Sequence, residues 1–166
     1  MRKYVFRKYK EDYPKLYVLE KKRLMKILPK EAKIEHIGST AVLGLGGKGI
    51  LDIQIGFKTK DEMKKAEKIM EKRGYQIMPG SKRFGRISLK KYYGLIFWRR
   101  RVHIHLVIFN GRIWKRNIKF RNNLRKNKEL RAKYEKMKKE AVKYAKGEGK
   151  KYRKYKDKFI KKYQNG

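Results

Sequence analysis

The chain has 166 residues, which predicts one domain with a buried core of normal size. It contains no cysteine, so disulfides, thiolate metal sites and cysteine nucleophiles are excluded. Its 51 lysine and arginine residues against 15 acidic residues give a formal net charge of +36. This charge predicts a polyanionic partner. The alternatives are compositional drift and adaptation to high intracellular salt.

The first half of the chain predicts helices and strands in alternation, from the spacing of its apolar residues. In chain order they are the helix Pro14–Leu28, the strands Ala32–Ile37 and Ile50–Phe57, the helix Asp61–Arg73 and the strand Tyr75–Met78. Leu19 and Ile69 are among the positions expected to face the core. Residues Thr40–Gly47 are expected to form a loop or a short helical turn.

The second half predicts strands first and helices afterwards. The expected strands are Phe84–Leu89, Tyr93–Trp98 and Val102–Phe109, the last two joined by a basic tip. From Trp114 onward the apolar spacing is helical, with a break at Gly147 and Gly149. We therefore expect an α+β core over 1–110 and a basic helical extension over 111–166, packed on the core as a single compact unit.

The chain shows no membrane or secretion signal. Its apolar runs are far shorter than the roughly 20 residues that span a bilayer. The segment Met1–Lys10 lacks the apolar stretch of a signal peptide. These features predict a soluble cytoplasmic protein without a membrane partner.

A glycine–serine pair precedes a strand that carries a single acid. Gly38 and Ser39 are followed, after a glycine-rich run, by Asp52-Ile53-Gln54-Ile55. A glycine allows the backbone to approach a phosphate, and a serine offers its hydroxyl and N–H. This short pattern resembles the nucleotidyltransferase superfamily that includes DNA polymerase beta. The resemblance implies that the turn lies against nucleotide phosphates and that strand acids hold divalent metals.

A longer match is more specific. The runs concerned are Glu35–Val42, Gly44-Leu45, Lys48, Asp52-Ile53, His103–Val107, Phe120–Arg125 and the tail from Tyr134 to Ile160. Together they resemble the GrpB family over about Tyr13 to Tyr163. The resemblance implies an α+β fold, a nucleotidyltransferase-like mixed sheet flanked by helices, with a helical C-terminal extension. Leu43 departs from the family, which usually has proline there.

The donor set also departs from that of active nucleotidyltransferases. Gln54 stands where a second acid is usual, and the strand expected to carry a third acid offers His103 and His105. Mg²⁺ prefers oxygen ligands, whereas Mn²⁺ and Zn²⁺ accept imidazole. The predicted metal ligands are Asp52, Gln54, His103 and His105, with Mn²⁺, Mg²⁺ or Zn²⁺ and a nucleoside triphosphate as cofactors. Structural roles stay open as the alternative to metal binding. Asp52 could form a salt bridge with Lys48, and the histidines could be held by hydrogen bonds within the protein.

The remaining predicted roles follow from the resemblance and from charge. Asp52 and His105 are the predicted catalytic residues. The predicted phosphate contacts are His36, Gly38, Ser39, Thr40, Lys48, Arg121 and Arg125. The predicted nucleic-acid contacts are Trp98, Arg99, Arg100, Arg101, Arg112, Lys115 and Arg116, because aromatic and arginine side chains together stack bases and bind phosphates.

Three functions remain open from the sequence. The first is transfer of a nucleotidyl group to RNA or another polyanion. The second is a non-catalytic nucleic-acid-binding module on a degenerate transferase scaffold, favoured by Gln54, His105 and the net charge of +36. The third is a coenzyme or small-phosphate binder, by analogy with a related domain fused behind dephospho-coenzyme A kinase.

Overall fold

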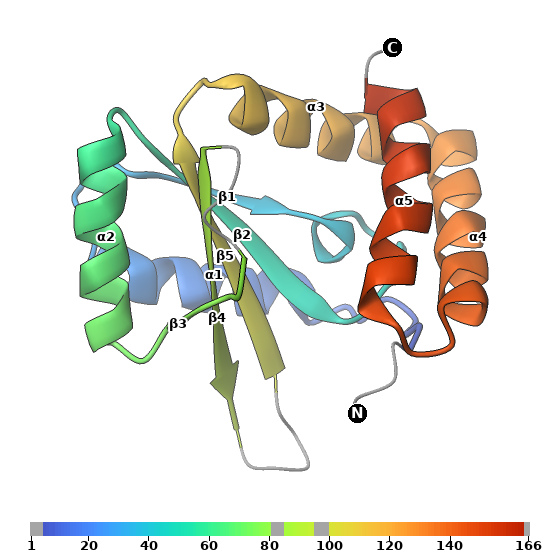
Figure 1. The fold of residues 1–166 in the computed structure, drawn as a ribbon, viewed down its shortest axis with the longest axis horizontal. Helices are drawn as coiled ribbons and strands as arrows, with labels where there is room; N and C mark the ends of the chain where they lie inside the picture. Colours follow the sequence, from blue (N-terminus) through green and yellow to red (C-terminus); the bar gives the residue numbers. More distant parts are fainter. Residues whose placement is uncertain (1–4, 81–84, 95–99, 165–166) are drawn as a thin grey trace.

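A five-stranded mixed sheet with helices on both faces forms the centre of the molecule (Figure 1). The computed structural model describes residues 5–80, 85–94 and 100–164. The sheet order is β1-β2-β5-β4-β3, in which β2 and β5 are parallel and the other neighbouring strands are antiparallel. The strands are β1 (Lys33–Ile37), β2 (Ile50–Phe57), β3 (Gln76–Ile77), β4 (Arg86–Tyr93) and β5 (Arg100–Ile108).

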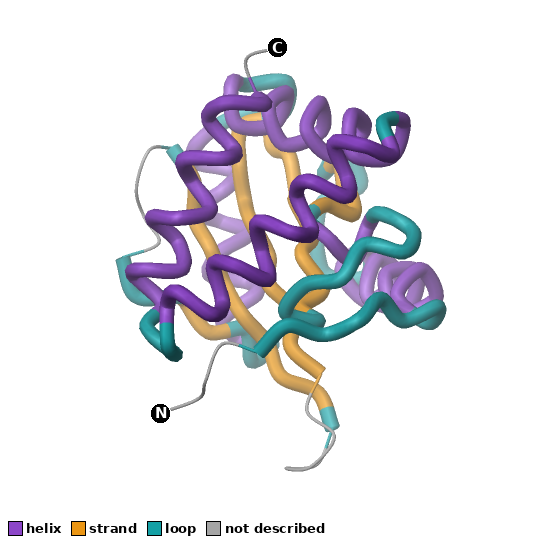
Figure 2. The backbone as a smooth tube through the Cα atoms, turned by 90° about the vertical axis from the view of Figure 1, so that its right-hand side faces the viewer, coloured by secondary structure: helices purple, strands orange, loops and turns teal. Residues whose placement is uncertain are grey.

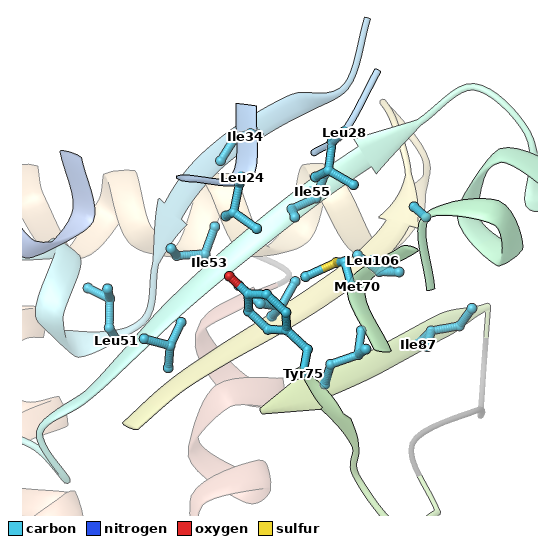
Figure 3. Close-up of a cluster of buried hydrophobic side chains, with 14 of the residues drawn as sticks. Leu24, Leu28, Ile34, Leu51, Ile53, Ile55, Met70, Tyr75, Ile87 and Leu106 are labelled. Atoms are coloured by element: carbon cyan, nitrogen blue, oxygen red, sulfur yellow. The ribbon is translucent and has the colours of Figure 1, made fainter. Parts of the chain in front are cut away.

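One face of the sheet is covered by two helices. The helices of the described residues are α1 (Tyr13–Met25), the 3-10 turn η1 (Ser39–Ala41), α2 (Lys60–Lys72), α3 (Arg112–Lys126), α4 (Lys128–Ala145) and α5 (Gly149–Gln164). Leu24 of α1 and Met70 of α2 are fully buried together with Ile53, Ile104 and Leu106 of the central strands. Figure 3 shows this cluster, which anchors β2 and β5.

The other face is covered by the basic C-terminal helices. Leu124 of α3, Ala141 of α4 and Tyr152 of α5 belong to a second buried cluster, together with Val42 and Leu45 of the loop after η1. Helices α4 and α5 are packed against each other, and Figure 2 shows them crossing in front of the strands. Val42 and Leu45 therefore attach the glycine-rich loop to these helices.

The predicted α+β architecture with a mixed, helix-flanked sheet is confirmed, but the expected division of the strands around residue 90 is wrong. Strand β4 runs without a break from Arg86 to Tyr93 and pairs with β5 over that length, so the gap expected between the strands Phe84–Leu89 and Tyr93–Trp98 is absent at residues 90–92. Beyond Gly94 the expected strand Tyr93–Trp98 stays a prediction. Residues 81–84 and 95–99 lie outside the described part. Among the described helices, none is long and apolar enough to cross a bilayer.

The expected inward positions of two helical residues are also wrong. Leu19 of α1 is 51% exposed and Ile69 of α2 is 38% exposed. In α1 the inward position belongs to Glu20, whose carboxylate accepts hydrogen bonds from the hydroxyls of Tyr75 and Tyr93. The sequence pattern favoured the apolar neighbour because it does not reveal hydrogen-bond donors that come from distant strands.

Candidate functional site

Asp52 lies between two histidines on the sheet face that carries α3–α5. The register pairs Asp52 with His103 and Gln54 with His105, so all four side chains share one face. Asp52 Oδ1 lies 3.6 Å from Nδ1 of His103 and 3.6 Å from Nε2 of His105. The carboxylate is 27% exposed, which leaves it open to a ligand.

The glycine–serine turn contacts the same carboxylate. Gly38 has a φ of 75° and a ψ of −169°, a conformation open essentially to glycine alone. A Cβ atom at Gly38 would lie 2.7 Å from Asp52 Oδ2. The turn and the strand acid, which are separated in sequence, are therefore neighbours in space.

We expect Gly38→Ala to unfold the chain more easily and to displace the Asp52 carboxylate. The strained backbone alone should cost about 1 to 3 kcal/mol in the free energy of unfolding. Gly44→Ala is the matched control, because Gly44 also has a positive φ (73°) but a Cβ there would meet no atom within 4 Å. Urea denaturation compares the two variants, and an equal loss in both would show that the approach to Asp52 is unimportant.

Several cationic side chains act electrostatically on Asp52 or on Lys48. The Lys48 ammonium lies 3.8 Å from the centre of the Tyr152 ring of α5. Burial, together with the charge of Lys156, lowers the pKa of Lys48 to about 7. Arg101 of β5 and Arg153 of α5 act on Lys48 in the same direction, so α5 delivers positive charge to the site. We call Gly38, Ser39, Lys48, Asp52, His103, His105 and Lys156 the Asp52 cluster.

The charge states of the cluster follow from these neighbours. Burial alone would raise the pKa of Asp52, but the interactions with His105, His103 and Lys156 outweigh it, so the pKa is below its ordinary value. Burial lowers the pKa of His103 to about 4. At neutral pH the cluster therefore holds an ionised Asp52 beside a neutral His103.

His105 is oriented from the neighbouring strand. Ser88 Oγ of β4 lies 3.1 Å from His105 Nδ1, while the opposite ring nitrogen faces Asp52. The order serine–histidine–aspartate is that of a hydrolase triad. Ser88 is only 3% exposed, however, so its hydroxyl fixes the ring instead of reaching a substrate.

Gln54 is engaged by α3. Its amide oxygen accepts a 2.6 Å hydrogen bond from Asn117 Nδ2, and its amide nitrogen donates to the Trp114 carbonyl at 3.5 Å. The residue is fully buried. These contacts give the glutamine a structural role, and its role as a metal ligand stays a prediction.

The donor set suits some divalent metals better than others. One carboxylate and two imidazoles match Mn²⁺ or Zn²⁺ more closely than Mg²⁺. In the described part of the chain, no group of three or more histidine, aspartate or glutamate side chains is arranged to hold a metal ion. Metal binding at Asp52 therefore requires its side chains to rearrange from their present contacts.

Four of the predicted phosphate contacts bind protein groups. Arg121 Nη1 donates to Glu35 Oε2 at 2.5 Å and to the His36 carbonyl at 2.8 Å, and Arg125 Nε donates to the Ala41 carbonyl at 2.9 Å. The His36 ring lies on the opposite sheet face, since His36 is paired with Ile53, and its Nε2 lies 2.9 Å from Thr40 Oγ1. These residues shape the turn, and phosphate contact by them remains a prediction.

The predicted nucleic-acid contacts fall into three groups. Trp98 and Arg99 lie outside the described residues, as does the side chain of Arg100. Arg101 acts electrostatically on His103, so it borders the Asp52 cluster. Arg112, Lys115 and Arg116 are exposed on α3.

The glycine loop is held by contacts that sequence reasoning missed. Glu135 Oε2 of α4 accepts a hydrogen bond from Gly46 N at 3.1 Å, and Lys138 Nζ donates to the Gly46 carbonyl. Arg7 pairs with Gly47 through backbone hydrogen bonds in both directions. The helical spacing of Glu135 and Lys138 places them on adjoining positions of α4, but no local signal reveals the loop as their partner.

Known proteins resemble the chain over most of its length. The sequence profile described as "GrpB protein" matches residues 4–165. The "Glutamate-rich protein GrpB" of Alkalihalophilus pseudofirmus is 30% identical over 131 residues, which cover 78% of this chain and 75% of that protein. The crystal structure of conserved protein GrpB from Enterococcus faecalis has a TM-score of 0.76 at 27% identity, and the match covers 96% of this chain and 99% of that one.

A more distant likeness concerns the fold alone. The Cid1 poly(U) polymerase in its MgGTP-bound crystal structure has a TM-score of 0.54 at 14% identity, over 82% of this chain and 44% of that one. The nucleotidyltransferase-like fold expected from the sequence is therefore confirmed. With a profile matched from residue 4 to residue 165, the chain belongs to the GrpB family.

Proposed function

We propose that the chain binds the phosphates of a nucleoside triphosphate at the Asp52 cluster and transfers a nucleotidyl group to a hydroxyl of an RNA acceptor. The observation that carries this proposal is the contact between the Gly38 turn and the Asp52 carboxylate, with Lys48 and Lys156 beside them. The likeness of the fold to that of a poly(U) polymerase is in keeping with it.

In the proposed reaction the Asp52 carboxylate has one role, and Lys48 with the Gly38 turn has another. The acceptor hydroxyl oxygen forms a bond to the α-phosphorus, and the bond from that phosphorus to pyrophosphate breaks. The hydroxyl proton passes to the Asp52 carboxylate, and the departing pyrophosphate lies against Lys48 and the Gly38 turn. A divalent ion held by Asp52, His103 and His105 would supply charge neutralisation of the phosphates.

Triphosphate binding is the first test. We expect ribonucleoside triphosphates to bind wild-type protein about tenfold or more tightly than the matching nucleosides, because the cations act on the phosphates. Lys48→Met should lose about tenfold in triphosphate affinity. Lys65→Met, on the exposed surface of α2, is the control with the same change of charge.

The measurement is isothermal titration with and without Mn²⁺, and equal loss in the two variants would contradict the proposal. A Mn²⁺-dependent gain in triphosphate affinity that disappears in His105→Gln would support metal binding at the cluster. A triphosphate affinity that is the same with and without Mn²⁺ would contradict metal binding at the cluster but not triphosphate binding.

A second candidate function is supported by Gln54. This residue is a glutamine, so the strand presents one acid instead of two, and its amide is buried and hydrogen-bonded to Asn117. A scaffold that has lost the second acid can retain RNA binding without turnover. RNA binding that is unchanged by Asp52→Asn, with no labelled product from an α-phosphate-labelled triphosphate, would favour this function over transfer.

A further inference from the structure

A cationic stripe follows one side of α4. Lys128, Arg131, Lys136 and Lys139 line an open hollow of about 520 Å³, with Gly44 at its edge. Their spacing of three to five residues keeps them on neighbouring turns of one helix side. From the first to the last the stripe is about 16 Å long, because a helix rises about 1.5 Å per residue. The hollow shares no lining residue with the Asp52 cluster.

The positive charge of this cationic stripe is only partly offset. Glu135 is the one acid that lines the hollow, and its oxygens are already used: Oε2 accepts from Gly46 N at 3.1 Å, and Oε1 lies 2.9 Å from Lys139 Nζ. Among the described residues, no carboxylate forms an ion pair with Lys128, Arg131 or Lys136. The stripe therefore offers three cations to a polyanion.

The stripe and the Asp52 cluster lie on opposite ends of one short loop. Gly44 borders the hollow, and Gly46 is bound by Glu135. Gly47 lies so close to the hydroxyl of Ser39 that a Cβ atom there would be 2.4 Å from it. The loop between Gly44 and Gly47, against which Phe6 and Arg7 also pack, thus connects the row of cations with the glycine–serine turn.

We propose that the cationic stripe on α4 binds the backbone of single-stranded RNA and leads that strand past Gly44 to the Asp52 cluster. The second half of this statement rests on the proposed function. One helix side beside one loop accommodates a single phosphate backbone, whereas a duplex presents two. Binding through phosphates predicts affinity that depends on salt and tolerates changes of sequence.

The test compares two variants that each lose three cations. The first is Lys128→Gln/Arg131→Gln/Lys136→Gln in the stripe. The second, as control, is Lys65→Gln/Lys68→Gln/Lys72→Gln on α2, where the three lysines are exposed. Figure 1 shows α2 and α4 at opposite ends of the sheet, so the control removes the same charge from a distant surface.

The probe is a labelled oligouridylate of about 12 nucleotides, followed by fluorescence anisotropy from about 50 to about 200 mM KCl. We expect the stripe variant to lose about 10- to 100-fold in affinity and its salt slope to fall by about 2, because each phosphate contact contributes about 0.7 on single strands. The control should stay within about threefold of wild type.

Two outcomes overturn the inference: equal losses in both variants, which would mean binding by overall charge, and a duplex of the same length that competes as well as the single strand. Titration of both variants with a ribonucleoside triphosphate separates this proposal from the proposed function. Retained triphosphate affinity with lost RNA affinity supports the stripe. Absence of triphosphate binding in wild type, with the RNA difference intact, removes the proposed function and the connection to Asp52 but leaves the RNA site.

Discussion

Replacing Asp52 with asparagine should strongly slow nucleotidyl transfer and, without metal, tighten the binding of triphosphate. Loss of the proton acceptor should lower the rate by about 10³-fold, within the range of general-base effects. The same change removes the negative charge that opposes phosphate among Lys48 and Lys156, so metal-free affinity should rise by about 3- to 10-fold. Opposite signs in the two measurements distinguish this result from misfolding, which would reduce both.

Asp61→Asn is the matched control for that variant. Asp61 lies in the first turn of α2 with its side chain 83% exposed, and the substitution removes the same charge. Transfer is followed with a triphosphate labelled at the α-phosphate and a short RNA, and binding is followed by titration in the presence of a chelator. Unchanged transfer in Asp52→Asn, or equal tightening in both variants, would contradict the assigned role.

The second large effect concerns pH and the free energy of unfolding. Burial lowers the pKa of Lys138, which is 3% exposed, and of Lys48 to about 7. In the unfolded chain a lysine has a pKa of about 10.4. Between these values the unfolded state binds more protons than the folded state, so the free energy of unfolding rises with pH. The penalty is complete below about pH 7 and disappears as the pH approaches the unfolded value.

Each of the two lysines adds up to about 1.4 kcal/mol per pH unit within that window. We therefore expect the free energy of unfolding to increase by about 2 kcal/mol or more between about pH 7 and about pH 9. Lys138→Met should remove close to half of this slope. The exposed Lys65→Met serves as control, because it reports the general relief of charge repulsion at high pH.

Urea denaturation at several pH values measures the slope. A wild-type stability that is flat or falls over this range contradicts the assignment of buried, easily deprotonated lysines. The same conclusion follows if Lys138→Met retains the full slope of the wild type. A slope that is halved in Lys138→Met and unchanged in Lys65→Met identifies the buried ammonium as its source.

The sequence predicted the fold because local patterns and a family resemblance agreed. Apolar alternation in β2 and helical spacing in α2 are local properties of the sequence. The structure contains both elements as expected, and only the ends of α2 differ by one residue. The sequence divided β4 into two expected strands because the pattern of apolar and polar residues does not show where a strand ends. Glu20 occupies the core position expected for Leu19 because the hydroxyls of Tyr75 and Tyr93 satisfy its carboxylate. The sequence did not reveal this, since both tyrosines are more than fifty residues away in the chain.

The site was predictable only where its residues lie on paired strands or on one turn. Asp52, His103 and His105 follow from strand periodicity once β2 and β5 are neighbours. Ser88 could have been found by the alternation of polar residues along β4. Lys156 and Lys138 could not, since their approach to Asp52 and Gly46 depends on how α4 and α5 pack, which no short segment encodes.

The hydrogen bonds that hold Gly46 affect how the protein binds a ligand. Both backbone polar groups of Gly46, its N–H and its carbonyl, are hydrogen-bonded to side chains of α4, and the next residue is paired with Arg7. A segment that is held by such contacts in the free protein loses less conformational entropy when a ligand binds. The loop beside Lys48 is thus preorganised for binding, so ordering this segment costs little of the binding free energy.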